Sequence, residues 1–157
     1  MHKHIAFIIL TLVTFQVHQV ATAQSSKPLY TFPLGVEAYT FRKSFPIDVA
    51  KTLDTIKMMG FTEMEGGSNK IRPGEFKKMC DERGISIPAT EADYNELVKS
   101  PDSVVQNAKL LGATYVMCAW IPHKDGVLTI DDAKKAVEDF NRAGKILKDN
   151  GLIFCYH

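Results

Sequence analysis

A glycine followed at once by a short apolar, β-rich run occurs four times in this chain, each time after a segment with helical spacing. The runs cover residues 60–65, 84–89, 112–118 and 151–156. Glycine suits such a junction because the residue that closes a helix often adopts a left-handed conformation, which glycine reaches without strain. Successive glycines are 24, 28 and 39 residues apart, close to the roughly 30 residues of a βαβ unit. Each repeat therefore predicts a helix followed by a strand.

Four segments with apolar residues at three- and four-residue steps predict the helices that precede these strands. The first covers Pro46–Met59, and the second begins at Pro73, since proline is tolerated in a first turn. The third begins at Ser100, an N-cap candidate, and the fourth at Thr129, where an acid three residues later resembles a capping box. With a further strand over Pro33–Tyr39, the predicted order is β-α-β-α-β-α-β-α-β.

Strict alternation of strands and helices predicts a parallel sheet with right-handed crossovers. Two architectures fit this order: an open doubly wound sheet, or part of an eight-stranded βα barrel. The first strand is not followed by a Gly-x-Gly-x-x-Gly motif, which disfavours the nucleotide-binding form of the open sheet. The predicted fold class is therefore α/β, with the pattern (βα)4β.

The first 23 residues have the order of a secretory signal peptide. A basic start over Met1–His4 precedes an apolar run over Ile5–Phe15, and Ala21-Thr22-Ala23 is a cleavage site. The run is shorter than the roughly 20 residues of a membrane span, and a permanent N-terminal anchor is the alternative. We expect a signal peptide over 1–23, a linker over 24–33 and a partial barrel over 34–157. The protein would be exported to the periplasm or the exterior, with no membrane attachment after cleavage.

Charge and cysteine content exclude several classes of partner and scaffold. Lys3 is the one lysine or arginine in the leader. The remaining 18 of the 19 basic residues balance 18 acidic residues, so the net charge after residue 23 is zero. No basic stripe is present, which argues against a nucleic-acid partner. Cys80, Cys118 and Cys155 are odd in number and form no Cys-x-x-Cys pair, so no disulfide framework is expected.

Polar and aromatic residues gather where the predicted strands end, which is where a parallel βα fold forms its site. Carboxylates and imidazoles bond sugar hydroxyls, and aromatic rings cover the apolar face of a sugar, so the set suits a polyhydroxylated small molecule. No zinc motif, nucleophile elbow or phosphate loop is present. The strand-end residues are Glu37, Tyr39, Arg42, Glu65, Thr90, Glu91, Asp93, Trp120, His123, Tyr156 and His157. Of these, we expect substrate contacts from Tyr39, Glu65, Trp120, His123 and His157.

Several of these residues also have a purely structural interpretation. Glu37 is either functional or part of an internal ion pair with a residue such as Arg42. Trp120 is either a stacking platform or a core residue, and His123, like Glu91 and Asp93, is either functional or a solvated loop residue.

Four segments in their order and spacing resemble the sugar phosphate isomerase/epimerase family, the xylose-isomerase-like barrels that also include endonuclease-four-type repair enzymes. The segments are 35–42, 59–65, 118–123 and 151–157, and the resemblance spans Leu34–His157. It implies a (βα)8 barrel of roughly 250 residues, of which this chain would supply the N-terminal half. It also implies a divalent metal (Mn, Mg, Zn or Co) whose ligands lie after His157. No metal ligand and no catalytic residue is therefore assigned within this chain, while the Tyr39 region, Glu65, Trp120 and His157 match pocket positions.

The resemblance implies metal-assisted proton transfer next to the carbonyl of a sugar or keto-sugar. We expect the chain to be a fragment of a secreted isomerase/epimerase-like protein, inactive by itself. The alternatives are an extracytoplasmic carbohydrate-binding or keto-glycoside lyase/hydrolase-type relative, and a self-assembling half-barrel. A DNA-repair enzyme is disfavoured by the zero net charge and the leader.

Overall fold

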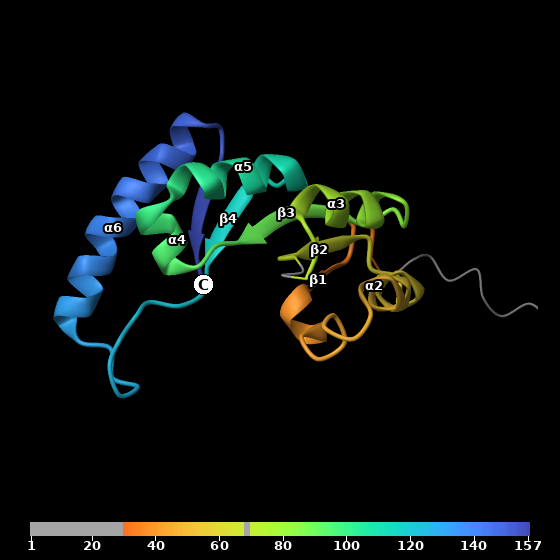
Figure 1. Cartoon of the computed structure of the whole chain (residues 1–157), viewed down its shortest axis with the longest axis horizontal. Coiled ribbons are helices and arrows are strands. Elements are labelled where there is room, and N and C mark those ends of the chain that lie inside the picture. Colours follow the sequence, from red (N-terminus) through yellow and green to blue (C-terminus); the bar gives the residue numbers. More distant parts are fainter. Residues whose placement is uncertain (1–29, 68–69) are drawn as a thin grey trace, which may run out of the picture. The chain divides into compact units, whose positions relative to one another are not determined.

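The computed structural model describes residues 30–67 and 70–157, so the predicted signal peptide and most of the predicted linker lie outside the described residues. The chain divides into two units, 1–32 and Pro33–His157, and the second contains the sheet. Its strands pair in parallel in the order β1-β2-β3-β4-β5, as the alternating pattern predicts (Figure 1). They are β1 Gly35–Glu37, β2 Glu63–Glu65, β3 Ser86–Glu91, β4 Tyr115–Cys118 and β5 Ile153–Tyr156.

The four predicted helices are confirmed, and two shorter elements were not foreseen. The predicted helices are α2 Val49–Met58, α3 Pro73–Asp81, α5 Pro101–Leu111 and α6 Ile130–Asp149. The short helix α4, Tyr94–Lys99, lies between β3 and α5, and a 3-10 turn, η2, covers Ala38–Phe41. The prediction that the first strand reaches Tyr39 is therefore wrong, since the extended backbone ends at Glu37.

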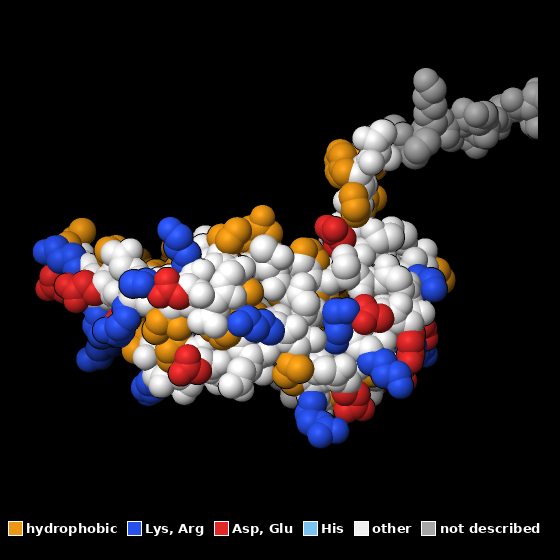
Figure 2. Space-filling model, turned by 90° about the horizontal axis from the view of Figure 1, so that it is seen from above, with side chains coloured by type: hydrophobic (Ala, Val, Ile, Leu, Met, Phe, Trp, Pro, Cys, Tyr) orange, Lys and Arg blue, Asp and Glu red, His pale blue; other side chains and the backbone are white. Residues whose placement is uncertain are grey.

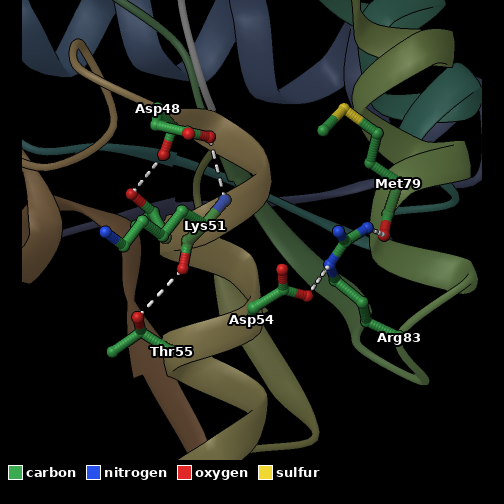
Figure 3. A network of polar contacts seen from close by, with 7 residues as sticks. Asp48, Lys51, Asp54, Thr55, Met79 and Arg83 are labelled. Atoms are coloured by element: carbon green, nitrogen blue, oxygen red, sulfur yellow. Dashed lines mark hydrogen bonds and ion pairs between the residues drawn. The ribbon is translucent and has the colours of Figure 1, made fainter.

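The start of α2 is set by side-chain capping rather than by the proline at position 46. Asp48 is the N-cap, and its carboxylate accepts a hydrogen bond of 2.9 Å from the backbone N–H of Lys51 (Figure 3). The same view shows Arg83, after α3, donating a 2.7 Å hydrogen bond to Asp54 of α2. This pair ties two neighbouring βα units together on their outer side.

The four junction glycines all have the left-handed backbone that the sequence pattern requires. Gly60, Gly84, Gly112 and Gly151 have φ values of 90°, 68°, 73° and 78°. Each therefore ends a helix and turns the chain into the following strand.

The sheet has one face against the helices and one face free of them. Val116 is fully buried in the core with helix residues such as Leu53, Phe76 and Leu147. Its neighbour Tyr115 points the other way and is 42% exposed. We call the face that carries Tyr115 the open face. Pairing places one row across all five strands on this face: Glu37, Glu65, Ala89, Tyr115 and Ile153.

A bulge in β3 decides which of its residues reach the open face. Glu63 pairs with Ser86 and Glu65 with Ala89, so three steps along β3 match two along β2. Pro88, which lacks a backbone N–H, lies within this irregular stretch, as proline in a sheet commonly does. Ile87 is buried before the bulge and Thr90 after it, so alternation changes phase between them. As a result Glu91 faces the same side as Glu65 instead of the helices.

A buried polar network joins α4 to α6. The Tyr94 hydroxyl donates a hydrogen bond of 2.5 Å to Oδ2 of Asp139, which is 3% exposed. Lys135 and Arg142 donate to the same carboxylate at 3.0 and 2.6 Å. The carboxylate is thus paired by two cations and a hydroxyl, as a buried charge requires.

The described surface mixes charges of both signs. Figure 2 shows Lys and Arg interspersed with Asp and Glu, without a stripe of one sign on the face in view. Among the described residues, no helix is long and apolar enough to cross a membrane.

Candidate functional site

The carboxyl ends of three strands bring together two carboxylates and an imidazole. Glu37 ends β1, Glu65 ends β2, and His157 follows β5. One ligand atom from each of these side chains lies within 4.8 Å of the other two. The structure thus unites two predicted contact residues, Glu65 and His157, with Glu37. We call these three residues the rim cluster.

Gly66 follows Glu65 directly, and its surroundings leave little room for a side chain. Its φ is +91°, and its backbone N–H donates a 2.9 Å hydrogen bond to the carbonyl of Ala89. A Cβ atom at this position would lie 3.2 Å from Cβ of Ala38 and 3.7 Å from Oε2 of Glu91. Glycine is therefore favoured both by the left-handed backbone and by the close approach of Ala38.

Glu91 adds a third carboxyl group to this region. The residue keeps contact with solvent, but its carboxyl group is partly withdrawn from water, and this burial raises its pKa. The nearby carboxylates of Glu37 and Glu65 raise the pKa further, and His157 acts in the opposite direction. Glu91 therefore holds a proton to higher pH than an ordinary glutamate, which suits a residue that donates a hydrogen bond to a ligand oxygen.

A cavity of about 350 Å³ opens beside Glu91 at the ends of β1 and β3. Tyr39, Arg42, Thr90, Glu91 and Glu96 contribute to its lining. The Arg42 guanidinium lies over the Tyr39 ring, 4.4 Å from its centroid, and donates a 3.1 Å hydrogen bond to the Tyr39 carbonyl. Arg42 is thus held by Tyr39, and no ion pair among residues 30–67 and 70–157 joins it to Glu37.

A second cavity, of about 400 Å³, is also lined by Glu91. Asp93, Glu96 and Trp120 contribute to its lining. Trp120 is 53% exposed, so the interpretation of this side chain as a core residue is wrong. Its ring lies 5.1 Å from that of His123, whose Nδ1 is 2.7 Å from the carbonyl oxygen of Ile121. The two predicted contact residues of this segment therefore form one aromatic pair at the edge of the cavity.

The structure also gives two strand-end residues structural roles. Tyr156 packs on Phe140 of α6, with ring centroids 5.5 Å apart, and so lies toward the helices. Asp93 borders the second cavity, but its carboxylate caps α4, where it accepts a 2.8 Å hydrogen bond from the backbone N–H of Asn95. Glu96 lines both cavities and was missed, because α4 was not foreseen. An Asp before a short segment with apolar residues at three-residue steps was the available signal.

The donor set of the rim cluster fits a divalent cation. Carboxylates suit Mg²⁺ and Mn²⁺, imidazole suits Zn²⁺ and other transition metals, and a mixed set suits a borderline ion such as Zn²⁺. Two carboxylates and one imidazole leave at least one coordination position for water or substrate. That the metal ligands lie after His157 remains a prediction. The rim cluster offers a different set of donors within this chain.

No family model matches the chain, and neither does any curated protein. Among solved structures, a sugar phosphate isomerase/epimerase from Parabacteroides distasonis matches with a TM-score of 0.63 and 26% identity. The match covers 87% of this chain. The fold is that of the xylose-isomerase-like TIM barrels, as the resemblance in the sequence implied.

Two further solved structures share the fold at lower identity. The IolI protein with a bound zinc atom matches with a TM-score of 0.60 and 12% identity, over 80% of this chain and 51% of that one. A probable 3-DHS dehydratase from Bacillus anthracis matches with a TM-score of 0.59 and 7% identity, over 80% and 52%. This chain spans about half the length of the solved structures it matches, 55% in the Parabacteroides protein.

Proposed function

We propose that this chain forms the substrate-binding half of an isomerase/epimerase-like enzyme that acts on a sugar or keto-sugar. The observation that carries the proposal is that Glu91 lines two cavities at the carboxyl end of the sheet. The fold shared with a sugar phosphate isomerase/epimerase supports it. In parallel βα folds this end of the strands is where substrates bind.

The reaction we propose is proton transfer next to a carbonyl, with a divalent cation in the complete protein. When bound, such a cation stabilises the negative charge that develops on the carbonyl oxygen. Residues of this chain would bind and orient the sugar: Tyr39 and Trp120 by stacking, and Glu65 and His157 by hydrogen bonds to hydroxyls. Glu91, whose pKa is raised by burial, would donate its proton in a hydrogen bond to a sugar oxygen.

The sole tryptophan allows a direct binding test. Adding a keto-sugar such as fructose to the full chain, with a chelator present, should change the fluorescence of Trp120. Glu91→Ala, which removes the donor, should weaken binding by roughly tenfold, the effect of losing about 1.4 kcal/mol of interaction. Glu82→Ala, at the C-cap of α3, is the matched control and should bind like the wild type. Unchanged fluorescence at saturating sugar would count against the proposal.

A second candidate is a carbohydrate-binding or keto-glycoside lyase/hydrolase-type protein. The observation that favours it is the second cavity beside Trp120, since two cavities that share Glu91 could each take one unit of a glycoside. An experiment with the complete protein in heavy water distinguishes the two candidate functions. NMR measures whether deuterium exchanges into the sugar next to the carbonyl. Exchange into a free sugar supports an isomerase, and glycoside cleavage without it supports the second candidate.

We further propose that turnover needs βα units beyond those of this chain. The sheet spans about half of the barrels it matches, and β1 and β5 each have one edge that pairs with no other strand among the described residues. The 157-residue chain should bind sugar but show no isomerisation with any divalent metal. A self-assembling half-barrel is the alternative, and sedimentation as a compact dimer with turnover would favour it.

The proposal includes export. The order of residues 1–23 supports cleavage after Ala23, and periplasmic or extracellular protein should then begin at Gln24. Replacing Ala23 by Arg should leave the leader attached, whereas replacing Lys27 by Arg should not. N-terminal sequencing of the fractionated protein reads both outcomes, and mature protein that still begins at Met1 would oppose export by this route.

A further inference from the structure

Glu37 and Glu65 occupy directly paired positions of neighbouring strands. Their Cα atoms are register partners in the parallel ladder between β1 and β2. Like charges at directly paired positions repel, and partial withdrawal from water strengthens the repulsion. Both side chains are half-buried. This arrangement costs stability unless a cationic group lies beside the two carboxylates.

The lysine and arginine ion pairs found within residues 30–67 and 70–157 involve neither Glu37 nor Glu65. The group that does approach is His157, a nitrogen donor that is also a common metal ligand. It comes from the far end of the strand order, so the sheet itself, and not local sequence, brings it to the carboxylates.

The spacing of the donors matches one shared ion. Zinc bonds to nitrogen and oxygen are about 2.0–2.2 Å, so two donors of one ion lie at most about 4.4 Å apart. The donors of the rim cluster lie within 4.8 Å of one another, so side-chain rotations of a few tenths of an ångström complete the geometry.

We propose that Glu37, Glu65 and His157 bind one divalent cation, zinc or manganese, at the carboxyl ends of β1, β2 and β5. These residues differ from the ligands that the family resemblance implies, which would lie after His157. The site uses the same end of the sheet as the proposed sugar site, but the claim rests on the side-chain donors and not on the substrate.

The first test titrates the metal-free full chain with Zn²⁺ in the absence of sugar, and isothermal titration calorimetry measures the binding. We expect one bound ion. Glu65→Gln and His157→Asn should each weaken binding by more than about tenfold, since even the loss of a group that only supports a metal ligand weakens binding by that much. Glu63→Gln, on the same face two residues earlier, is the matched control and should bind like the wild type. Equal losses in Glu63→Gln and Glu65→Gln, or no binding by the wild type, would overturn the proposal.

The second test compares the thermal midpoints of Glu65→Gln and the wild type with and without metal. The difference between them should change sign, which a folding defect does not produce. Without metal, Glu65→Gln removes one of two repelling charges and should raise the thermal midpoint. With saturating Zn²⁺ the order should reverse, because only the wild type gains stability from the ion. A variant that is less stable under both conditions would contradict the proposed pairing. Because no sugar is present, failure here leaves the sugar-binding proposal intact, and fluorescence in chelator tests that proposal separately.

Discussion

Tyr94 donates a hydrogen bond of 2.5 Å to Asp139, a residue 45 positions later in the chain, and both side chains are buried. The pair fastens α4, which carries Glu96 at the edge of both cavities, to the long helix α6. The geometry of the candidate site therefore depends on a contact well outside it.

Replacing Tyr94 by Phe should lower the free energy of unfolding by about 1.5–3 kcal/mol, the usual value of a hydrogen bond to a charged group. The ring and its packing on Phe140 remain, so the loss reports the hydroxyl alone. Urea denaturation followed by circular dichroism measures it. Tyr115→Phe, on the open face and partly exposed, is the control and should change stability by less than about 0.5 kcal/mol. A similar loss in both variants would show that the hydrogen bond to Asp139 is not the cause.

The same hydroxyl predicts a loss of stability in alkali. Burial, followed by the hydrogen bond to Asp139, raises the pKa of Tyr94 to about 12. The unfolded chain releases this proton near pH ~10, so the unfolded state is favoured as pH rises from there to the folded value. Stability should fall between these limits in the wild type and less in Tyr94→Phe. Denaturation at several pH values, with tyrosinate absorbance recorded in parallel, tests this. Identical alkaline slopes for both proteins would exclude Tyr94 as the source.

Alanine at Gly66 should destabilise the protein more than alanine at Gly60. The two glycines have nearly the same φ, +91° and +90°, but an added Cβ meets Ala38 and Glu91 at Gly66 and nothing within 4 Å at Gly60. The left-handed backbone alone costs about 1–3 kcal/mol, so Gly60→Ala measures strain and the excess in Gly66→Ala measures crowding. Urea midpoints of the two variants compare them. Equal losses would mean that the space beside Glu91 is not restricted.

Thr129→Ala should cost about 1 kcal/mol, because it removes the hydroxyl that caps α6. The backbone N–H of Asp132 donates to the Thr129 hydroxyl at 3.2 Å, and the Asp132 carboxylate accepts from the Thr129 N–H at 3.0 Å. Ser100 is also an N-cap, that of α5, but its side chain makes no capping hydrogen bond. Ser100→Ala should therefore be nearly neutral. If both substitutions cost the same, the reciprocal bonds at Thr129 contribute no stability.

The sequence predicts the sheet well because glycine junctions and helical spacing are local signals. The four long helices, the parallel strand order and the location of polar residues at strand ends all follow from them. The sequence does not predict α4, because Tyr94–Lys99 has only six residues. The stronger helix-start signal is the Ser100-Pro101 pair that follows it. The end of β1 was misplaced because η2 begins directly after Glu37 without a proline or glycine to mark it.

The composition of the candidate site was only partly predictable for a different reason. Glu65, His157, Tyr39 and Trp120 were predicted from their positions at strand ends, and the structure brings them to the same end of the sheet. That Glu37 joins Glu65 and His157 depends on register between strands, which local sequence does not specify. The role of Glu96 depends on a tertiary contact, the hydrogen bond between Tyr94 and Asp139.

The bulge at Pro88 determines which residue of β3 faces the site. If the same residues ran without the bulge, strict alternation from Ile87 would send Thr90 outward and turn Glu91 toward the helices. A hydroxyl would then replace a carboxyl group beside the two cavities, and an acid would be forced into the apolar layer. The one extra residue that β3 carries against β2 thus decides whether an acid faces the site, with every side chain of the strand unchanged.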